Sequence, residues 1–244
     1  MLEDILNHFS VEVATSPVAR DRVYRLRHRV YCEEHGYEPL TADRREKDHH
    51  DSHSVFCTLT HRETGLMAGC VRLILASSDE VLAMEEHCRE YMYVGDLECM
   101  QERRHEICEI SRLAVEPTFR KRPVESRVAM GDFSARSFGE DERRLFSLLG
   151  IATLLTGFAA ADLLHRRRNY AMMEAGLNRL LVRSGIVVHQ VGQFMEYHGR
   201  RAPFFTTTDL LLEHMRPDMK FLFRQIRSEL AVVAHAPAVA ADGY

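Results

Sequence analysis

The sequence predicts a single domain of the α/β (α+β) class, in which strands and helices alternate. The chain has 244 residues, 45% hydrophobic and 28% charged, which is enough for one well-buried core. The hydrophobic spacing changes repeatedly between short apolar runs, typical of strands, and the helical period. Pro and Gly mark several segment ends. The predicted order is strand, helix, two strands, an insertion, then strand, helix, strand, helix and strand.

The N-terminal third has the clearest signals. Ser16-Pro17 starts a helix, with proline at its first position, and Gly36 ends it as a C-cap. Two apolar runs, Ser54 to Thr60 and Met67 to Leu75, surround the turn Glu63-Thr64-Gly65 and predict a hairpin. The other elements expected here are a strand from Val11 to Ala14, a polar loop from Pro39 to His53, and an irregular insertion over residues 77–104 with a short helix from Met84 to Tyr91.

The second half is organised around one long apolar helix. Leu145 to Ala161 carries no charge over seventeen residues, the lower edge of a membrane-spanning length. Ser, Thr and Gly interrupt it and its leucines follow one helical face, so we expect a helix buried against the sheet and no transmembrane segment. The other elements expected are a strand Glu106–Val115, a charged loop Glu116–Arg144, a strand Tyr170–Met173, a helix Leu177–Ser184 and a strand Ile186–Val191. Residues 1–230 form the domain, and residues 231–244 a flexible C-terminal tail.

The net charge and the cysteines indicate which kind of partner the protein binds and in which cellular compartment it is expected. The formal net charge of -4 argues against nucleic acid as the main partner. No CxxC pair occurs, and several cysteines lie in apolar strand-like runs, so buried reduced thiols are favoured over disulfides or zinc. The six are Cys32, Cys57, Cys70, Cys88, Cys99 and Cys108. The N-terminus lacks the pattern of a signal peptide, and we expect a cytoplasmic protein.

Charged residues occur in segments that otherwise read as core. Arg27 lies on the first amphipathic helix, Arg72 within an apolar strand, and Glu109 and Arg112 three residues apart within another. An unpaired buried ion is costly, so these side chains are expected to form one network.

Four motifs resemble the acyl-homoserine-lactone autoinducer synthases, which are acyltransferases of the GNAT fold. They are VYRLRHRVYCEEHGYE, the loop Asp48-His49-His50-Asp51, GCVRLIL and EISRLAV. The chain is more similar to N-acyl amino acid synthases and exosortase-associated acyltransferases, in VYCEE, ISRLAVEPTFRKR, MMEAGLNRLLVRSGI and YHGRRAPFF. The resemblance runs from about residue 20 to about 215. It implies a GNAT-like acyltransferase fold, with a central mixed, mostly antiparallel sheet flanked by helices.

The resemblance also implies a set of site residues. Six charged positions match the family's site cluster: Arg27, Asp48, Asp51, Arg72, Glu109 and Arg112. Tyr31 and Tyr37 stand where the autoinducer synthases carry Phe and Trp, which weighs against homoserine-lactone synthesis. The other residues expected to bind substrate are Leu113, Val115 and His198, the last on a turn, Tyr197 to Pro203, that borders the pocket.

Amide formation from an acyl thioester needs a deprotonated amine, a positioned carbonyl and stabilisation of the oxyanion. Glu109 is the best candidate for the general base, since burial raises a carboxylate pKa; the alternative is an ion pair with Arg72 or Arg112. Catalytic roles are also expected for Ser111 and Arg112. A regular strand would point Glu109 and Arg112 to opposite faces. The fold that the chain resembles has a bulge in this strand, and we predict one near Ser111 to Leu113.

The remaining charged groups suit the two substrates. The guanidinium groups of Arg27, Arg72 and Arg112 match an acceptor carboxylate or a pantetheine phosphate. Asp48 and Asp51 either orient these guanidinium groups or receive the ammonium of the acceptor.

The donor is expected to be an acyl carrier protein. The loop from Val115 to Pro123 has no glycine for a pyrophosphate cradle, which disfavours a nucleotide donor. Its basic residues suit docking of an acidic carrier protein, the alternative being a solvated flexible loop. They are Arg120, Lys121, Arg122 and Arg127. We expect no bound cofactor, because the acyl thioester on phosphopantetheine is a co-substrate.

Histidines are abundant, with fourteen in the chain. His49, His50 and His53 lie in one short loop and offer possible ligands for a metal ion, but adjacent loop histidines are usually solvated. We expect no metal site.

The sequence therefore predicts an enzyme that transfers a medium- or long-chain fatty acyl group from an acyl carrier protein to the amine of an amino acid. One alternative is autoinducer synthesis from S-adenosylmethionine. The other is a non-catalytic protein that binds an acyl ligand or a carrier protein.

Overall fold

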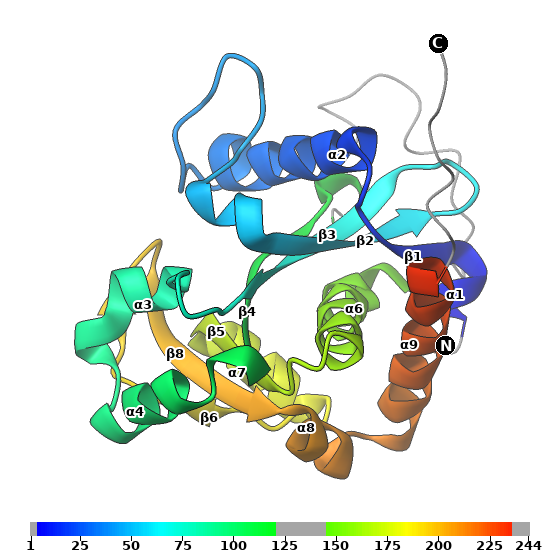
Figure 1. Cartoon of the computed structure of the whole chain (residues 1–244). Coiled ribbons are helices and arrows are strands. Elements are labelled where there is room, and N and C mark those ends of the chain that lie inside the picture. Colours follow the sequence, from blue (N-terminus) through cyan, green and yellow to red (C-terminus); the bar gives the residue numbers. More distant parts are fainter. Residues whose placement is uncertain (1–3, 121–144, 236–244) are drawn as a thin grey trace.

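The computed structural model describes residues 4–120 and 145–235, and a twisted sheet runs through the whole of it (Figure 1). Its strand order is β1-β2-β3-β4-β5-β8-β6, with β7 paired to β8. The strands are β1 Phe9–Val13, β2 Ser54–His61, β3 Met67–Leu75, β4 Ile107–Val115, β5 Arg168–Glu174, β6 His189–Gln190, β7 Met195–Glu196 and β8 Arg200–Thr207. Among these strands β4 and β5 pair in parallel and the other neighbours are antiparallel. This confirms the prediction of a mixed, mostly antiparallel sheet.

Helices cover both faces of the sheet. They are α1 Ile5–His8, α2 Pro17–Arg27, α3 Ala83–Cys88, α4 Val94–Glu102, α6 Leu149–Leu163, α7 Ala175–Arg183, α8 Thr208–His214 and α9 Pro217–His235. In Figure 1, α2 lies above strands β2 and β3, while α6 and α9 lie together below them. The helix α3 belongs to the insertion over residues 77–104 and lies on the same side of the sheet as α2.

The long apolar segment forms α6, and it is a core helix. Nearly every residue from Leu149 to Ala161 is buried. Gly157 allows the helix to lie close to β3, because a Cβ atom there would stand 3.1 Å from Cγ1 of Val71. Within the described residues, no helix is both long and apolar enough to cross a membrane.

The predicted first helix is also present. The Ser16 hydroxyl caps α2 by accepting a hydrogen bond from the backbone N–H of Ala19. The α-helix ends at Arg27 and continues as a π-helix, His28–Glu34, before Gly36 takes a φ of 62°. π-helical turns change which side chains face inward. Here Arg27 is the last α-helical residue and is fully buried.

The C-terminal part of the sequence prediction is partly wrong. The expected strand Ile186–Val191 is shorter than predicted, because only His189–Gln190 forms a strand, β6. Strand β8, which the sequence did not predict, pairs with β5. Residues 197–203 were expected to form a turn, but β8 begins at Arg200, inside that range. Arg200, Arg201 and Pro203 are unusual in a strand interior, and pairing with β5 over seven residue pairs outweighs their weak propensity.

The predicted tail starts too early. Helix α9 continues to His235, so residues 231–235 are helical, and residues 236–244 lie outside the described residues. The amphipathic α9 packs against α6 and β1, which supplies the stabilisation that an Ala-rich segment lacks alone. Most of the expected charged loop Glu116–Arg144 also lies outside the described residues.

Candidate active site

A β-bulge interrupts the pairing of β3 and β4 at the predicted place. Ser111 pairs with Arg72 and Ala114 with Cys70, so two residues of β4 stand opposite Val71 alone. Arg112 occupies the bulge with a φ of 48°. The extra residue changes the alternation of the strand. As a result Glu109, Ser111 and Arg112 all contact groups on the face that α2 and α3 cover.

Arg27 is the most deeply buried charge of the site. Its side chain has no exposed surface, Nε donates to the carboxylate of Glu46, and Nη1 donates to Asp51 at 2.8 Å. The opposite charges of Glu46 and Asp51 hold its pKa above the ordinary value despite burial. Arg27 therefore ties the π-helical end of α2 to the acidic loop.

Arg72 joins the same loop to the bulge. Its Nη1 donates to Asp48 and, at 2.8 Å, to Asp51, while Nε donates to Ser111 Oγ at 3.0 Å. Asp48 caps the short helix His49–His53, and Asp51 accepts a hydrogen bond from the N–H of Asp48. The predicted aspartates are therefore held by both the guanidinium groups and their own backbone.

Arg112 completes the network. Its guanidinium contacts Glu38 at 2.9 Å, Glu46 at 3.2 Å and Asp48 at 3.3 Å, and lies 5.3 Å from the ring centre of Tyr31. Sequence reasoning missed Glu38 and Glu46, which lie in a polar loop without periodicity. The network joins three guanidinium groups, those of Arg27, Arg72 and Arg112, to four carboxylates, those of Glu38, Glu46, Asp48 and Asp51. The single excess negative charge suits an ammonium group.

Glu109 is buried beside this network, with 2% of its surface exposed. Its carboxylate accepts a hydrogen bond of 2.8 Å from the backbone N–H of Met84 in α3. Among the described residues, Glu109 forms no ion pair with Arg72 or Arg112. The alternative role, a structural ion pair with one of these arginines, is therefore not observed. Burial raises the pKa of Glu109 to about 7, although the Met84 N–H and the two arginines act in the opposite direction. Such a value suits a general base.

A cavity of about 240 Å³ opens where β4 and β5 separate. The two strands are paired only from Ile107 to Glu109, and beyond that point they diverge. Tyr31, Ser111, Arg112 and Leu113 line the cavity together with residues of β5 and α7. The bulge therefore forms one wall of the cavity, while the side chain of Glu109 lies outside the lining.

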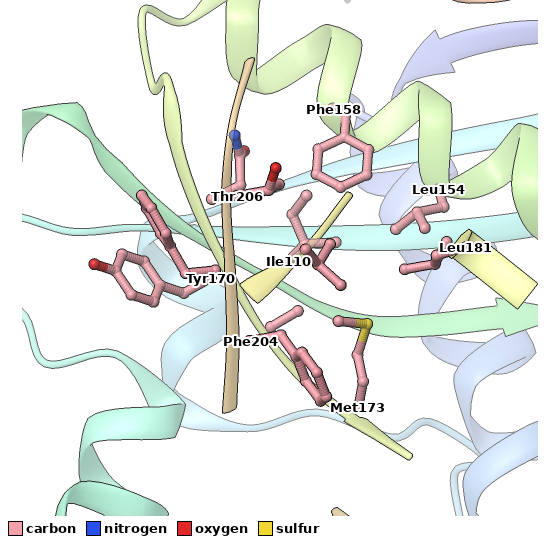
Figure 2. Close-up of a pocket in the computed structure, with 12 residues that line it drawn as sticks. Ile110, Leu154, Phe158, Tyr170, Met173, Leu181, Phe204 and Thr206 are labelled. Carbon is pink, nitrogen blue, oxygen red and sulfur yellow. The ribbon is translucent and has the colours of Figure 1, made fainter. Parts of the chain in front are cut away.

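An apolar pocket lies next to this cavity in the core (Figure 2). Figure 2 shows the side chains of Ile110, Leu154, Phe158, Met173 and Phe204 around it. The cavity and the pocket share four lining residues, namely Ile110, Leu154, Ala171 and Met173. Side chains nearly fill the pocket, which holds about 20 Å³ of free space. A flexible hydrocarbon chain that enters it has to displace mobile side chains such as methionine.

A row of aromatic rings lies beside the charged network. Ring centres are 5.2 Å apart for Tyr37 and His198, 4.5 Å for His198 and Tyr197, and 4.9 Å for Tyr197 and His87. His198 has a φ of 49°, lies 3.5 Å from Glu38, and has its pKa lowered by burial. The row joins the end of α2 to α3. Tyr197 and His87 were not among the predicted site residues.

The other predicted site residues differ in how they lie relative to the bulge. The Tyr31 hydroxyl donates to the carbonyl of Leu113 at 2.9 Å, and burial raises the pKa of Tyr31 to about 12. Val115 packs against the main core and does not line the cavity, contrary to the prediction, because the bulge turns it toward α6. Arg120 donates to the carbonyl of Val115 and pairs with Glu34. Lys121, Arg122 and Arg127 lie outside the described residues.

One protein-family model matches part of the chain. Residues 26–129, which include the end of α2, the acidic loop and the bulged strand, match the family model of the acetyltransferase (GNAT) domain. Over these residues the chain is similar to a GNAT domain, in agreement with the GNAT-like fold that the sequence predicts. A search of the curated proteins found no match.

Solved structures share the GNAT fold at low sequence identity. TofI, in a ternary complex with an inhibitor and MTA, is 18% identical, with a TM-score of 0.59 over 87% of this chain and 99% of that chain. MesI, a CoA-dependent acyl-homoserine lactone synthase, is 17% identical, with a TM-score of 0.57 over 96% and 100%. FeeM, an N-acyl amino acid synthase from uncultured soil microbes, is 13% identical, with a TM-score of 0.55 over 85% and 94%. These likenesses confirm the autoinducer-synthase-like fold.

Proposed function

We propose that this GNAT protein transfers a medium- or long-chain fatty acyl group from an acyl carrier protein thioester to the amine of an amino acid. The observation that carries the proposal is the cavity at the β4 bulge, which shares four lining residues with the apolar pocket of Figure 2. A short acetyl group would need no such pocket. The N-acyl amino acid synthase FeeM shares the fold and supports the choice of product.

The acyl donor extends through the gap between β4 and β5 in this proposal. Its hydrocarbon chain lies among Ile110, Leu154 and Phe158, and its thioester carbonyl lies at the bulge. A bulge leaves backbone groups outside the regular pairing of the strand. An N–H of this kind near Arg112 or Leu113 stabilises the oxyanion that forms when the amine attacks. Collapse of this intermediate breaks the C–S bond, and the pantetheine thiolate leaves and takes up the proton that Glu109 accepted from the amine.

The amine is activated on the other side of β4. Glu109 takes its proton through a water molecule, because the carboxylate faces α3 rather than the cavity. The excess negative charge of the network attracts the ammonium form of the acceptor before the proton is lost. Ser111 and Arg112 position the reacting groups, since both line the cavity and both belong to the network.

The donor is proposed to be a carrier protein because the loop after β4 has no glycine for a pyrophosphate cradle. MesI, which shares the fold, is described as CoA-dependent, so the two donors have to be compared directly. The four basic residues from Arg120 to Arg127 are the proposed docking surface. All six cysteines are free, which supports a cytoplasmic location, and the resemblance to exosortase-associated acyltransferases stays a prediction.

The second candidate function is acyl-homoserine lactone synthesis, which the fold of MesI favours. Tyr31 and Tyr37 count against it, because they replace the family's Phe and Trp. A third candidate, a non-catalytic protein that binds acyl ligands, fits poorly with a buried carboxylate whose pKa is raised to about 7.

Purified protein with acyl carrier protein thioesters of several chain lengths and a mixture of amino acids tests the proposal. We expect N-acyl amino acids with free carboxylates, and faster turnover than with the matching acyl-CoA. Equal turnover with acyl-CoA would contradict the carrier-protein donor. Product that appears only with S-adenosylmethionine, together with methylthioadenosine, would contradict the reaction itself.

A further inference from the structure

Three side chains with metal-binding atoms converge beside the acidic loop. The Nε2 atoms of His49 and His50 lie 3.3 Å and 3.0 Å from Oε2 of Glu86, and the three ligand atoms all lie within 4.8 Å of one another. Glu86 belongs to α3, more than thirty residues further along the chain. The sequence shows only the histidines, which alone resemble a solvated loop; the folded chain adds the carboxylate.

The spacing of these atoms suits a tetrahedral ion. Zinc binds His nitrogen and Glu oxygen at about 2.0–2.2 Å, so neighbouring ligand atoms of a tetrahedral site lie roughly 3.3–3.5 Å apart. Two His nitrogens and one carboxylate oxygen form a known zinc ligand set, with a fourth position open for water. His49–Glu86 and His50–Glu86 already approach this spacing.

Burial fixes one of the three ligands in place. His50 is 3% exposed, and its Nε2 lies 3.0 Å from Oε2 of Glu86, so this ligand atom already faces the carboxylate. The other ring nitrogen of His50, Nδ1, is buried without a hydrogen-bond partner; it lies beside the three ligand atoms and is not one of them.

We propose that His49, His50 and Glu86 bind one divalent transition-metal ion of the zinc class. The ion would link the acidic loop to α3. On one side, Asp48 and Asp51 flank the two histidines and hold the arginines of the network. On the other, Met84 is two residues from Glu86 and donates to Glu109. The ion is therefore structural, and it fixes both supports of the candidate active site without contacting substrate.

The test uses untagged full-length protein that has been treated with a chelator, desalted and titrated with Co²⁺, then with Zn²⁺ in competition. We expect one ion per chain, a visible absorption spectrum of tetrahedral Co²⁺, and displacement by Zn²⁺. His49→Asn and Glu86→Gln each lower the affinity at least about tenfold, in line with the effect of losing a ligand or its support. Both side chains are largely solvent-exposed, at 68% and 42%, so the variants are expected to fold.

Matched controls exclude binding by other histidines or carboxylates. His105→Asn changes a histidine that is 80% exposed, and Glu90→Gln an exposed glutamate at the end of the same segment as α3. Both are expected to bind Co²⁺ as the wild type does. Zn²⁺ should raise the melting temperature of the wild type and both controls but not of Glu86→Gln. Absence of saturable binding, or binding that neither His49→Asn nor Glu86→Gln weakens, would overturn the proposal.

Discussion

At the scale of single residues, Glu109 decides whether the site has a usable base. Its carboxylate is buried, accepts one backbone N–H and forms no ion pair among the described residues. An ion pair would hold its pKa low and keep it inactive as a base near neutral pH. Burial instead raises the pKa to about 7, which places the proton transfer in the useful range.

Glu109→Gln should lower kcat about 10²- to 10⁴-fold, because Gln has the same shape but cannot accept the proton. In the wild type only the ionised carboxylate is active, so kcat/KM rises with pH and levels off above about 7.

The titratable or charged groups that interact with Glu109 include Arg72, Arg112, Asp48, Cys88 and Tyr197. The measurement is a pH–rate profile, with the exposed Glu98→Gln as control. A flat profile from pH 5 to 9 would exclude the role.

The same substitution should stabilise the fold at alkaline pH. The folded-state pKa of Glu109 is raised from 4.5 to about 7, so the wild type loses stability as pH rises through this window. A shift of that size corresponds to roughly 3–4 kcal/mol. Glu109→Gln never ionises, and its free energy of unfolding should exceed that of the wild type at pH 8 but equal it near pH 4.5. Urea unfolding at both pH values measures the difference; equal stability at pH 8 would contradict the burial argument.

Arg72→Met should destabilise the protein by about 3–5 kcal/mol, because Asp48 and Asp51 would lose a buried partner. Arg89→Met removes an exposed arginine and should change stability by less than about 0.5 kcal/mol. Chemical denaturation of both variants provides the comparison. Equal midpoints for Arg72→Met and the wild type would show that the network does not hold the loop.

Of the six charged positions that the resemblance implies, five lie in the ion-pair network, whereas Glu109 lies beside it and has no ion pair among the described residues. Arg27, Asp51 and Arg72 meet as expected because charges in apolar segments must find partners when they are buried. Glu38 and Glu46 escaped prediction for the opposite reason. They lie in a polar loop, where an acidic side chain needs no partner, and only the folded loop shows that Glu46 is buried against Arg112.

At the scale of elements, the bulge in β4 brings Arg112 to the same face of the sheet as Glu109 and Ser111. It could be predicted because Glu109 and Arg112 would otherwise point to opposite faces, and the register shift confirms it. The strand β8 could not be predicted in the same way. Its N-terminal half carries Arg200, Arg201 and Pro203, and pairing with β5 and β7 stabilises it as a strand.

The junction between the cavity and the apolar pocket should control acyl chain length. Ala171 of β5 lines both, and Ala171→Leu adds bulk at that point. We expect kcat/KM for the longest acyl donors to fall at least about tenfold, since misfit of one or more methylenes costs that much, while short donors are spared. Product profiles by mass spectrometry measure the shift, and Ala175→Leu at the exposed start of α7 is the control. An unchanged profile would place the acyl chain elsewhere.

At the scale of the whole molecule, the sequence predicts some elements of the fold and misses others. The sequence predicted the first helix, the hairpin, the bulged strand and α6, because each has a strong local pattern. It missed α8 and α9. Helix α9 packs against α6 and β1, and α8 contacts β8. Tertiary contacts decide such segments.

The most direct test of the proposed reaction is mass spectrometry of the lipids that accumulate when the protein is expressed, compared with the Glu109→Gln variant. We predict N-acyl amino acids with medium or long chains in the wild type, absent or strongly reduced in a folded, equally abundant variant. Accumulation of acyl-homoserine lactones with methylthioadenosine, or the same N-acyl amino acids in both strains, would contradict the account.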